Sequence, residues 1–201
     1  MHRTLFLQQE LRKLQHANPR AVVLDVGNLE KQGALHKKLM QEFPGFEWHG
    51  LDILDQKSVG LHFEHQTIGS FEVMPFPDES FDAIYIGEVI EHTWEPKKVL
   101  DRCNAILKKG GVLILDTPNV YSLSRMLRYL LTGRDIVAGN PEHKIFFSAA
   151  MLELLFAQSN FHIHTMASEM NFVTRKAKFP LPAVGPFKMM GECLLVSARK
   201  K

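Results

Sequence analysis

The chain has 201 residues, of which 45% are hydrophobic and 23% are charged, and its formal net charge is +2. This length suits one domain with a sizeable core, and the composition excludes low-complexity and collagen-like chains. The small net charge gives no reason to expect a nucleic-acid partner, and no apolar run approaches the length of a membrane span.

Two further features bear on the location of the protein. The apolar start of the chain is interrupted at Gln8, too early for a secretory signal peptide. Cys103 and Cys193 are the two cysteines, and reduced thiols inside the fold are their simplest interpretation. We therefore expect a cytoplasmic protein.

The predicted elements alternate between helix and strand along the chain. Leu7, Leu11 and Leu14 recur at helical spacing, which predicts a helix near 3–16 within an N-terminal segment 1–18. The apolar run 21–26 is typical of a parallel strand that is covered on both faces. Further strands are expected near 48–53, 65–68, 81–86, 112–115, 161–167 and 193–198.

Capping residues mark several of the later helices. Pro96 suits the first turn of a helix, and Gly133 is a stop signal for the apolar stripe that begins at Leu123. Ser148 is a good N-cap for a helix that reaches about residue 158, and Asn160 is expected to end it. Another helix is expected around 35–43.

This alternation predicts an α/β fold with a parallel sheet, in one domain over 1–201. Segment 171–190 contains Pro180, Pro182 and Pro186 and is predicted to be a long loop, a type of segment that often carries function. Ligands of parallel α/β sheets bind beyond the carboxyl ends of the strands. The segments at those ends are 25–33, 52, 70–71, 87–92 and 116–119.

Five short motifs follow one another in a characteristic order and spacing. They are Pro75-Phe76-Pro77-Asp78-Glu79-Ser80-Phe81-Asp82-Ala83, Glu88-Val89-Ile90-Glu91-His92, Ile106-Leu107-Lys108-Lys109-Gly110-Gly111, Asp116-Thr117-Pro118-Asn119 and His143-Lys144-Ile145-Phe146-Phe147-Ser148. Together they resemble the methyltransferase type 11 group of class I S-adenosylmethionine-dependent methyltransferases, relatives of the quinone-pathway enzymes. The resemblance implies a Rossmann-like fold with a mostly parallel seven-stranded sheet, an antiparallel C-terminal hairpin strand, and helices on both faces.

The resemblance also implies which residues bind S-adenosylmethionine. The loop after the first strand, with Asp25, Gly27 and Asn28, would approach the methionine part of the cofactor. The remaining cofactor-binding residues would be Asp52 on the ribose, Ile53 against adenine, Ser70 and Phe71 near the adenine edge, and Gly87 and Glu88 in the cleft floor. Two positions depart from the family pattern, because Leu29 replaces a usual glycine and Ser70 a usual aspartate.

Glu88, Glu91 and His92 are spaced to share one face of a helix, and His143 arrives from a later motif. They have three interpretations. They form a polar rim; or Glu88, His92 or His143 acts in catalysis as the group that takes a proton from the acceptor; or all four hold a divalent metal ion. A metal ion is a candidate cofactor here, but the sequence alone does not lead us to expect one.

Three functions remain open at this point. The first is methyl transfer to an oxygen or carbon atom of a small-molecule acceptor, bound by the N-terminal helix, segment 120–140 and the 171–190 loop, which would cover the acceptor site. The second is a non-enzymatic binding module of the same fold, because the Leu29 side chain would fill part of the cofactor cleft. The third is a metal-assisted RNA-end 2′-O-methyltransferase, against which the weak positive charge argues.

Overall fold

A computed structural model describes residues 2–133, 140–169, 171–173, 178–180 and 188–201. Its main sheet has seven strands in the order β3-β2-β1-β4-β5-β9-β6. Strands β1 to β5 pair in parallel, and β9 runs antiparallel to both β5 and β6. The predicted α/β fold with an antiparallel C-terminal strand is therefore confirmed.

The elements follow the predicted alternation closely. The strands of the main sheet are β1 (Val22–Val26), β2 (Glu47–Asp52), β3 (Gln66–Ile68), β4 (Phe81–Gly87), β5 (Leu107–Pro118), β6 (Phe161–Ser168) and β9 (Cys193–Lys200). The helices are α1 (Arg3–Ala17), α2 (Glu30–Glu42), α3 (Pro96–Ile106), α4 (Leu123–Thr132) and α5 (Ala149–Gln158), with short 3-10 helices η1 (Gln56–Val59) and η2 (Ile90–His92).

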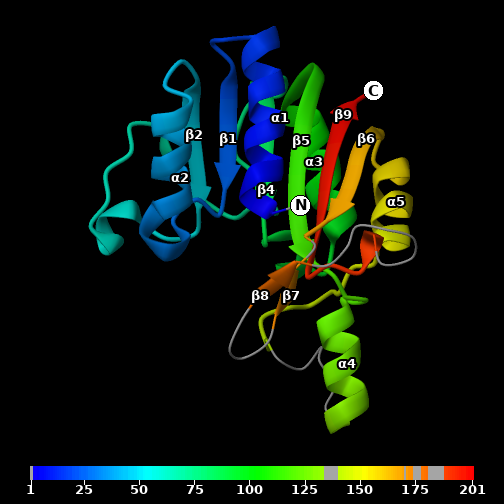
Figure 1. Ribbon diagram of the computed structural model, residues 1–201. Helices are drawn as coiled ribbons and strands as arrows, with labels where there is room; N and C mark the ends of the chain where they lie inside the picture. Colours follow the sequence, from blue (N-terminus) through cyan, green and yellow to red (C-terminus); the bar gives the residue numbers. More distant parts are fainter. Residues whose placement is uncertain (1, 134–139, 170, 174–177, 181–187) are drawn as a thin grey trace.

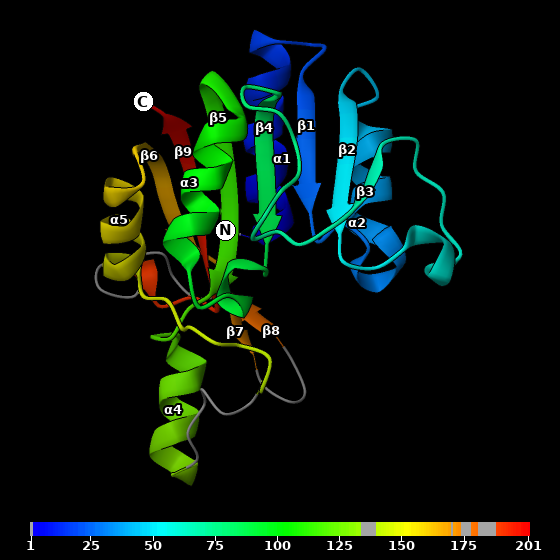
Figure 2. The same cartoon turned by 180° about the vertical axis from the view of Figure 1, so that it is seen from behind.

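Helices cover both faces of the sheet (Figures 1 and 2). One face buries a core that includes Phe6, Leu39 and Trp48 from the side of α1 and α2. The other face buries a larger core with Leu100 and Phe156, from α3 and α5. Because both faces are apolar, the polar groups of the central strands gather at the strand ends.

Local capping explains where several helices begin and end. The Ser148 hydroxyl accepts a hydrogen bond from the backbone N–H of Met151 at 3.2 Å, as expected for an N-cap. Gly133 takes the left-handed conformation at the end of α4, and Asn160 does so two residues after α5, with φ of 57°. The predicted stop signals are thus confirmed.

The structure corrects the prediction for part of segment 171–190. Within this segment β7 (Asn171–Val173) and β8 (Lys178–Pro180) pair as a small antiparallel sheet, so part of the predicted loop is regular structure. Residues 174–177 and 181–187 of this segment lie outside the described part. Helix α4 projects from the same end of the molecule, beyond the carboxyl edge of the main sheet (Figures 1 and 2).

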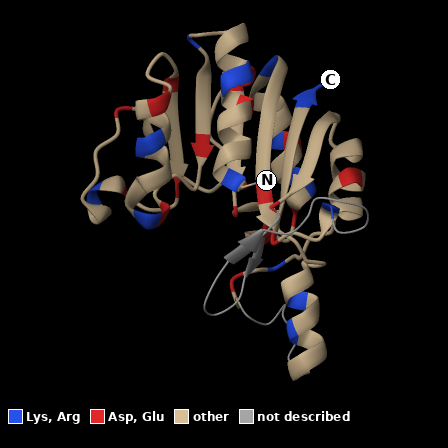
Figure 3. Cartoon of the chain, viewed as in Figure 1, with Lys and Arg blue, Asp and Glu red and all other residues tan. Residues whose placement is uncertain are grey.

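Among the described residues, none of the helices combines the length and the apolar character that crossing a bilayer requires. Basic and acidic residues are both scattered over several elements, and some of the acidic ones lie near the carboxyl ends of β1 and β5 (Figure 3).

The core packing of α5 gives a test of the fold. Phe156 is fully buried, whereas Leu154 on the same helix is 60% exposed. We expect Phe156→Ala to lower the free energy of unfolding by about 3–5 kcal/mol, because it leaves a cavity between α5 and the sheet. Leu154→Ala is the matched control and should change it by less than about 0.5 kcal/mol. Equal effects in urea unfolding would contradict this packing.

Candidate functional site

A cavity of about 940 Å³ opens at the carboxyl edge of the sheet, where β1, β2 and β4 end. From the strand ends it is lined by Val26, Gly27, Glu30, Leu51, Asp52, Ile53, Leu54, Gly69, Phe71, Gly87, Glu88, Val89, Glu91 and His92. The opposite wall comes from Pro118, Arg125, Asn140, Glu142, His143 and Lys144. This volume lies near the upper end of the range for small-molecule sites, which leaves room for two ligands.

The loop after β1 reaches the cavity at Gly27, a position where any side chain would be strained. Gly27 has φ of 75°, and a Cβ there would lie 2.7 Å from Cγ2 of Val89. Its backbone N–H donates to the carbonyl of Leu51 at 2.8 Å, which ties the end of β1 to β2. The cavity floor at this point is therefore bare backbone.

Leu29 does not occupy the cavity in the structure. Its side chain is 2% exposed and is absent from the cavity lining. Its backbone N–H donates to Oδ2 of Asp52 at 3.0 Å, so the residue contributes to the loop through its main chain. The branched side chain turns into the protein instead of into the space that a cofactor would need.

Asp52 ends β2 beside this loop. Its Oδ2 accepts from Leu29, and its Oδ1 accepts from the backbone N–H of Leu54 at 3.0 Å. These two bonds fix the carboxylate, and each oxygen keeps a lone pair for a further donor. Ile53, which follows, is 70% exposed and also lines the cavity.

Three of the residues predicted to bind cofactor lie outside the cavity lining. Asp25 is buried and hydrogen-bonded to Nδ1 of His36 at 2.8 Å, and burial raises its pKa. Asn28 exchanges two hydrogen bonds with the side chain of Gln66. The Ser70 hydroxyl accepts from the backbone of Glu72, so in the structure it shapes a turn.

Glu88 does not share a helical face with Glu91 and His92, which corrects the prediction. It has φ of 51°, and η2 begins only at Ile90. Its carboxylate Oε2 instead pairs with Nη1 of Arg3 at 2.8 Å. Arg3 comes from the start of α1, and sequence analysis missed it because an ion pair between distant segments leaves no local pattern.

Arg3 joins two carboxylates at the ends of β4 and β5. Its Nη1 lies 3.3 Å from Oδ1 of Asp116, while the Tyr85 hydroxyl donates to Oδ2 at 2.7 Å. Burial lowers the pKa of Arg3, but the charges of Asp116 and Glu88 raise it above its usual value, so Arg3 remains a cation. Burial raises the pKa of Asp116 to about 7, despite the opposing effects of Arg3 and Tyr85.

Glu91, His92 and His143 form the second polar cluster, on the far side of the cavity. One potential ligand atom from each lies within 4.8 Å of the others. The ring centroids of His92 and His143 are 5.0 Å apart at an interplanar angle of 85°. The cluster is held by Thr117, whose hydroxyl donates to Oε2 of Glu91 at 2.9 Å, and by the Glu142 carbonyl, 3.1 Å from Nδ1 of His92.

The second oxygen of Glu91 is the distinctive atom of this cluster. Oε1 is buried without a hydrogen-bond partner and lies 3.9 Å from Nε2 of His143. Burial raises the pKa of Glu91 to about 7, and burial together with the charge of His92 lowers the pKa of His143. The two atoms are too far apart for a hydrogen bond, so the pair suits either an imidazole that accepts a proton from a ligand or a cation bound between the two groups.

Sequence analysis named segment 120–140 and His143, which contribute to the outer wall of the cavity, but it missed the two cationic side chains of this wall. Arg125 on α4 donates from Nη1 to the carbonyl of Asn119 at 2.8 Å and lines the cavity together with Lys144. Lys144 adjoins His143, so the later motif was the available signal for it. Arg125 lies in a helix whose apolar stripe concealed its role.

The titration of Glu91 predicts a pH dependence of stability. The folded protein keeps this proton up to about pH 7, whereas the unfolded chain releases it near the ordinary pKa of 4.5. The stabilising contribution is therefore complete below pH 4.5 and is lost as the pH rises to 7. As the pH rises across that window, the free energy of unfolding of the wild type, measured in urea with a chelator present, should fall by about 3 kcal/mol more than that of Glu91→Gln. Parallel curves for the two proteins would contradict the shifted pKa.

Comparison with known proteins agrees with the geometry. Residues 24–115 match the family model described as a methyltransferase domain. A protein of Mycolicibacterium smegmatis named a probable S-adenosylmethionine-dependent methyltransferase is 28% identical over 134 residues, which are 58% of this chain and 49% of that protein. A ubiquinone biosynthesis O-methyltransferase of Xylella fastidiosa is 26% identical over 164 residues, which are 73% of this chain and 63% of that protein.

The chain thus spans less than two thirds of the length of each of these relatives. Among solved structures, an S-adenosylmethionine-dependent methyltransferase of Archaeoglobus fulgidus superposes with a TM-score of 0.67 at 16% identity, covering 98% of this chain and 94% of that one. At that identity the likeness concerns the fold. In sequence over residues 24–115 and in fold, the chain is thus similar to class I S-adenosylmethionine-dependent methyltransferases.

Proposed function

We propose that this protein transfers the methyl group of S-adenosylmethionine to an oxygen atom of a small-molecule acceptor. The observation that carries the proposal is that one cavity contains both a glycine-floored nucleotide end and a Glu91–His143 end. Relatives that act on small molecules support it, among them the ubiquinone biosynthesis O-methyltransferase.

The cofactor end of the cavity has the features that an adenosyl group requires. Gly27 leaves bare backbone for close approach, and Asp52 offers carboxylate lone pairs to ribose hydroxyls. The exposed Ile53 and the partly buried Phe71 offer apolar faces to adenine. Gly87 and Glu88 form the floor toward the methionine part.

When bound, the cofactor supplies an activated methyl group on a sulfonium. The chain has to align an acceptor with that group and to keep water out. Glu88 is a positioning residue at the boundary between the two ends of the cavity, because its carboxylate pairs with Arg3 and its backbone N–H donates to the carbonyl of Asp116.

On the acceptor side, His143 removes the proton from the acceptor oxygen. The lowered pKa of His143 keeps its imidazole neutral near pH 7, as a proton acceptor must be. Glu91 lies 3.9 Å from Nε2 and, once ionised above its pKa of about 7, stabilises the imidazolium that then forms. His92 packs edge-on against the ring. The same three side chains are the candidate ligands of a divalent cation, which is the competing role.

The cofactor assignment can be tested by thermal shift. S-adenosylmethionine or S-adenosylhomocysteine should raise the Tm of the wild type, because a ligand that binds only the folded state stabilises it. Asp52→Ala should abolish the shift, since it removes the ribose acceptor. Asp101→Ala, on α3 and outside the cavity lining, is the control and should keep the full shift.

Absence of a shift in the wild type at millimolar cofactor would contradict the assignment. It would instead favour a binding module of this fold that has lost methyl transfer.

The proton-transfer role can be tested by release of S-adenosylhomocysteine with a panel of phenols, catechols and hydroxy acids. His143→Ala should lower kcat about a hundredfold or more on any acceptor that is turned over, while the cofactor thermal shift persists. His162→Ala, an exposed position on β6, should leave kcat unchanged.

A base requires no metal ion, so wild-type turnover should survive EDTA. Turnover that is lost in EDTA and restored by magnesium or manganese would contradict the base assignment and make Glu91, His92 and His143 metal ligands.

A further inference from the structure

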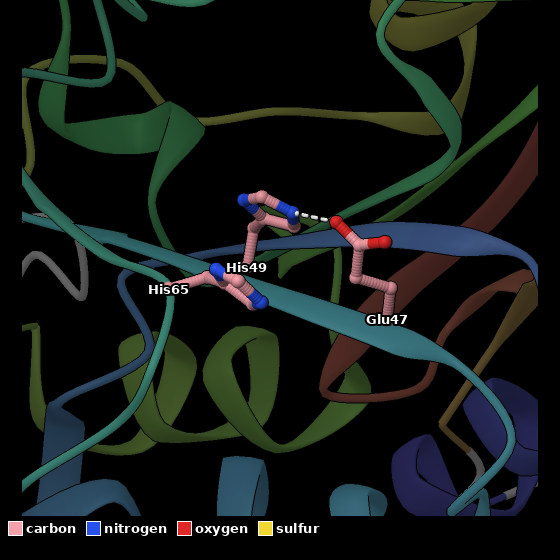
Figure 4. Close-up of side chains that lie close together, drawn as sticks. All are labelled: Glu47, His49 and His65. Carbon is pink, nitrogen blue, oxygen red and sulfur yellow. Dashed lines mark hydrogen bonds and ion pairs between the residues drawn. The ribbon is translucent and has the colours of Figure 1, made fainter.

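A second cluster of imidazole and carboxylate groups lies outside the cavity, on strand β2 and the residue that precedes β3. Glu47 and His49 are two residues apart on one strand, so their side chains point to the same face. His65 reaches the same place because β3 pairs with β2 in parallel from Gln66 onward. Figure 4 shows the three side chains together.

The contacts within this cluster preorganise it. Nε2 of His49 lies 2.7 Å from Oε1 of Glu47, and the His49 and His65 rings stack with centroids 4.6 Å apart at 16°. Phe81 contacts the His49 ring edge-on, with centroids 5.4 Å apart, and forms a rigid wall behind it. The hydrogen bond from His49 lowers the pKa of Glu47, so this carboxylate is an anion at neutral pH.

The cluster is separate from the cofactor cavity. None of its three residues lines that cavity. His49 is three residues before Asp52, a span of about 10 Å along an extended strand. The Glu47 side chain is 52% exposed and that of His49 is 22% exposed, so a small ion can reach them from solvent.

Two imidazole nitrogens and one carboxylate oxygen form a donor set that suits a borderline divalent cation. Zinc binds such ligands at about 2.0–2.2 Å, which places neighbouring ligand atoms about 3.3 Å apart. The potential ligand atoms here all lie within 4.8 Å of one another, so rotations that move them by about 1 Å would close the site. Magnesium and calcium prefer all-oxygen sites and fit this cluster poorly.

We propose that Glu47, His49 and His65 bind one zinc-like divalent transition-metal ion at this outer edge of the sheet, apart from the methyl-transfer site. The bound ion links β2 to the residue that precedes β3. Strand β3 has only three residues and pairs on one side alone, so it is the part of the sheet that gains most from such a link.

The test uses the full chain without an affinity tag, stripped of metal by a chelator. All variants carry His92→Ala and His143→Ala, which remove the cluster at the cavity as a second site. Zinc is titrated in competition with a chromophoric chelator, and the Tm is measured with and without an equimolar amount of zinc.

The background protein should bind one zinc ion and gain Tm, because the ion stabilises only the folded state. His65→Ala and Glu47→Gln should each weaken zinc binding about tenfold or more, and should remove most of the gain in Tm. His62→Ala is the matched control. His62 is an exposed histidine of the same segment and belongs to neither group of potential metal ligands among the described residues, so this variant should bind zinc as the background protein does.

Circular dichroism and Tm without zinc verify that each variant is folded before its affinity is compared. The proposal is overturned if the folded background protein takes up no zinc, or if it binds zinc no more tightly than His65→Ala. It is also overturned if His62→Ala weakens binding as much as His65→Ala does. None of these outcomes depends on methyl transfer, so failure here leaves the proposed function standing.

Discussion

Four carboxyl groups lie at the carboxyl edge of the sheet, on or just beyond strands whose faces are apolar, and each has a partner from another part of the chain. Asp25 pairs with His36 of α2, Glu88 with Arg3 of α1, Asp116 with Tyr85 and Arg3, and Glu91 with Thr117. A carboxylate that is removed from water without such a partner costs several kcal/mol. These partnerships therefore join α1 and α2 to the strand ends and hold the walls of the cavity in one arrangement.

The same arrangement divides the cavity into two chemical environments. Near Gly27 and Asp52 the cavity wall consists of backbone and of a carboxylate. Two backbone N–H groups fix the position of this carboxylate, and such a wall suits the ribose and the base of an adenosyl group. Near Glu91 and His143, burial raises the pKa of the carboxyl group and lowers the pKa of the imidazole, which suits proton movement. Leu29 fits this picture because its side chain is buried away from both environments.

Local patterns in the sequence predicted the fold well and the site in part. Ser148, Gly133 and Asn160 determine helix ends through their own backbone or side chain, so single residues were informative. The apolar runs predicted the strands, and the strand ends led to Gly27, Asp52 and His92 at the cavity. The left-handed backbone of Glu88 broke the predicted helical face, a feature that helical spacing cannot register.

Interactions between distant segments were beyond such patterns. The pairing of Arg3 with Glu88 joins residues 85 positions apart, and the stack of His65 on His49 depends on strand register. The small β7–β8 sheet forms in a segment whose prolines indicated a loop. Leu29 shows the same limit at a single position, because the sequence reveals a branched side chain but not the direction in which the chain turns it.

The central claim is that the space beside Gly27 admits an adenosyl group although Leu29 stands two positions later. A crystal structure grown with S-adenosylhomocysteine tests it most directly. The account predicts ligand density with the ribose hydroxyls on Asp52, the sulfur facing the His143 side of the cavity, and Leu29 still buried in the loop. A well-ordered structure in which the Leu29 side chain fills that space, with no ligand density at saturating concentration, would contradict it.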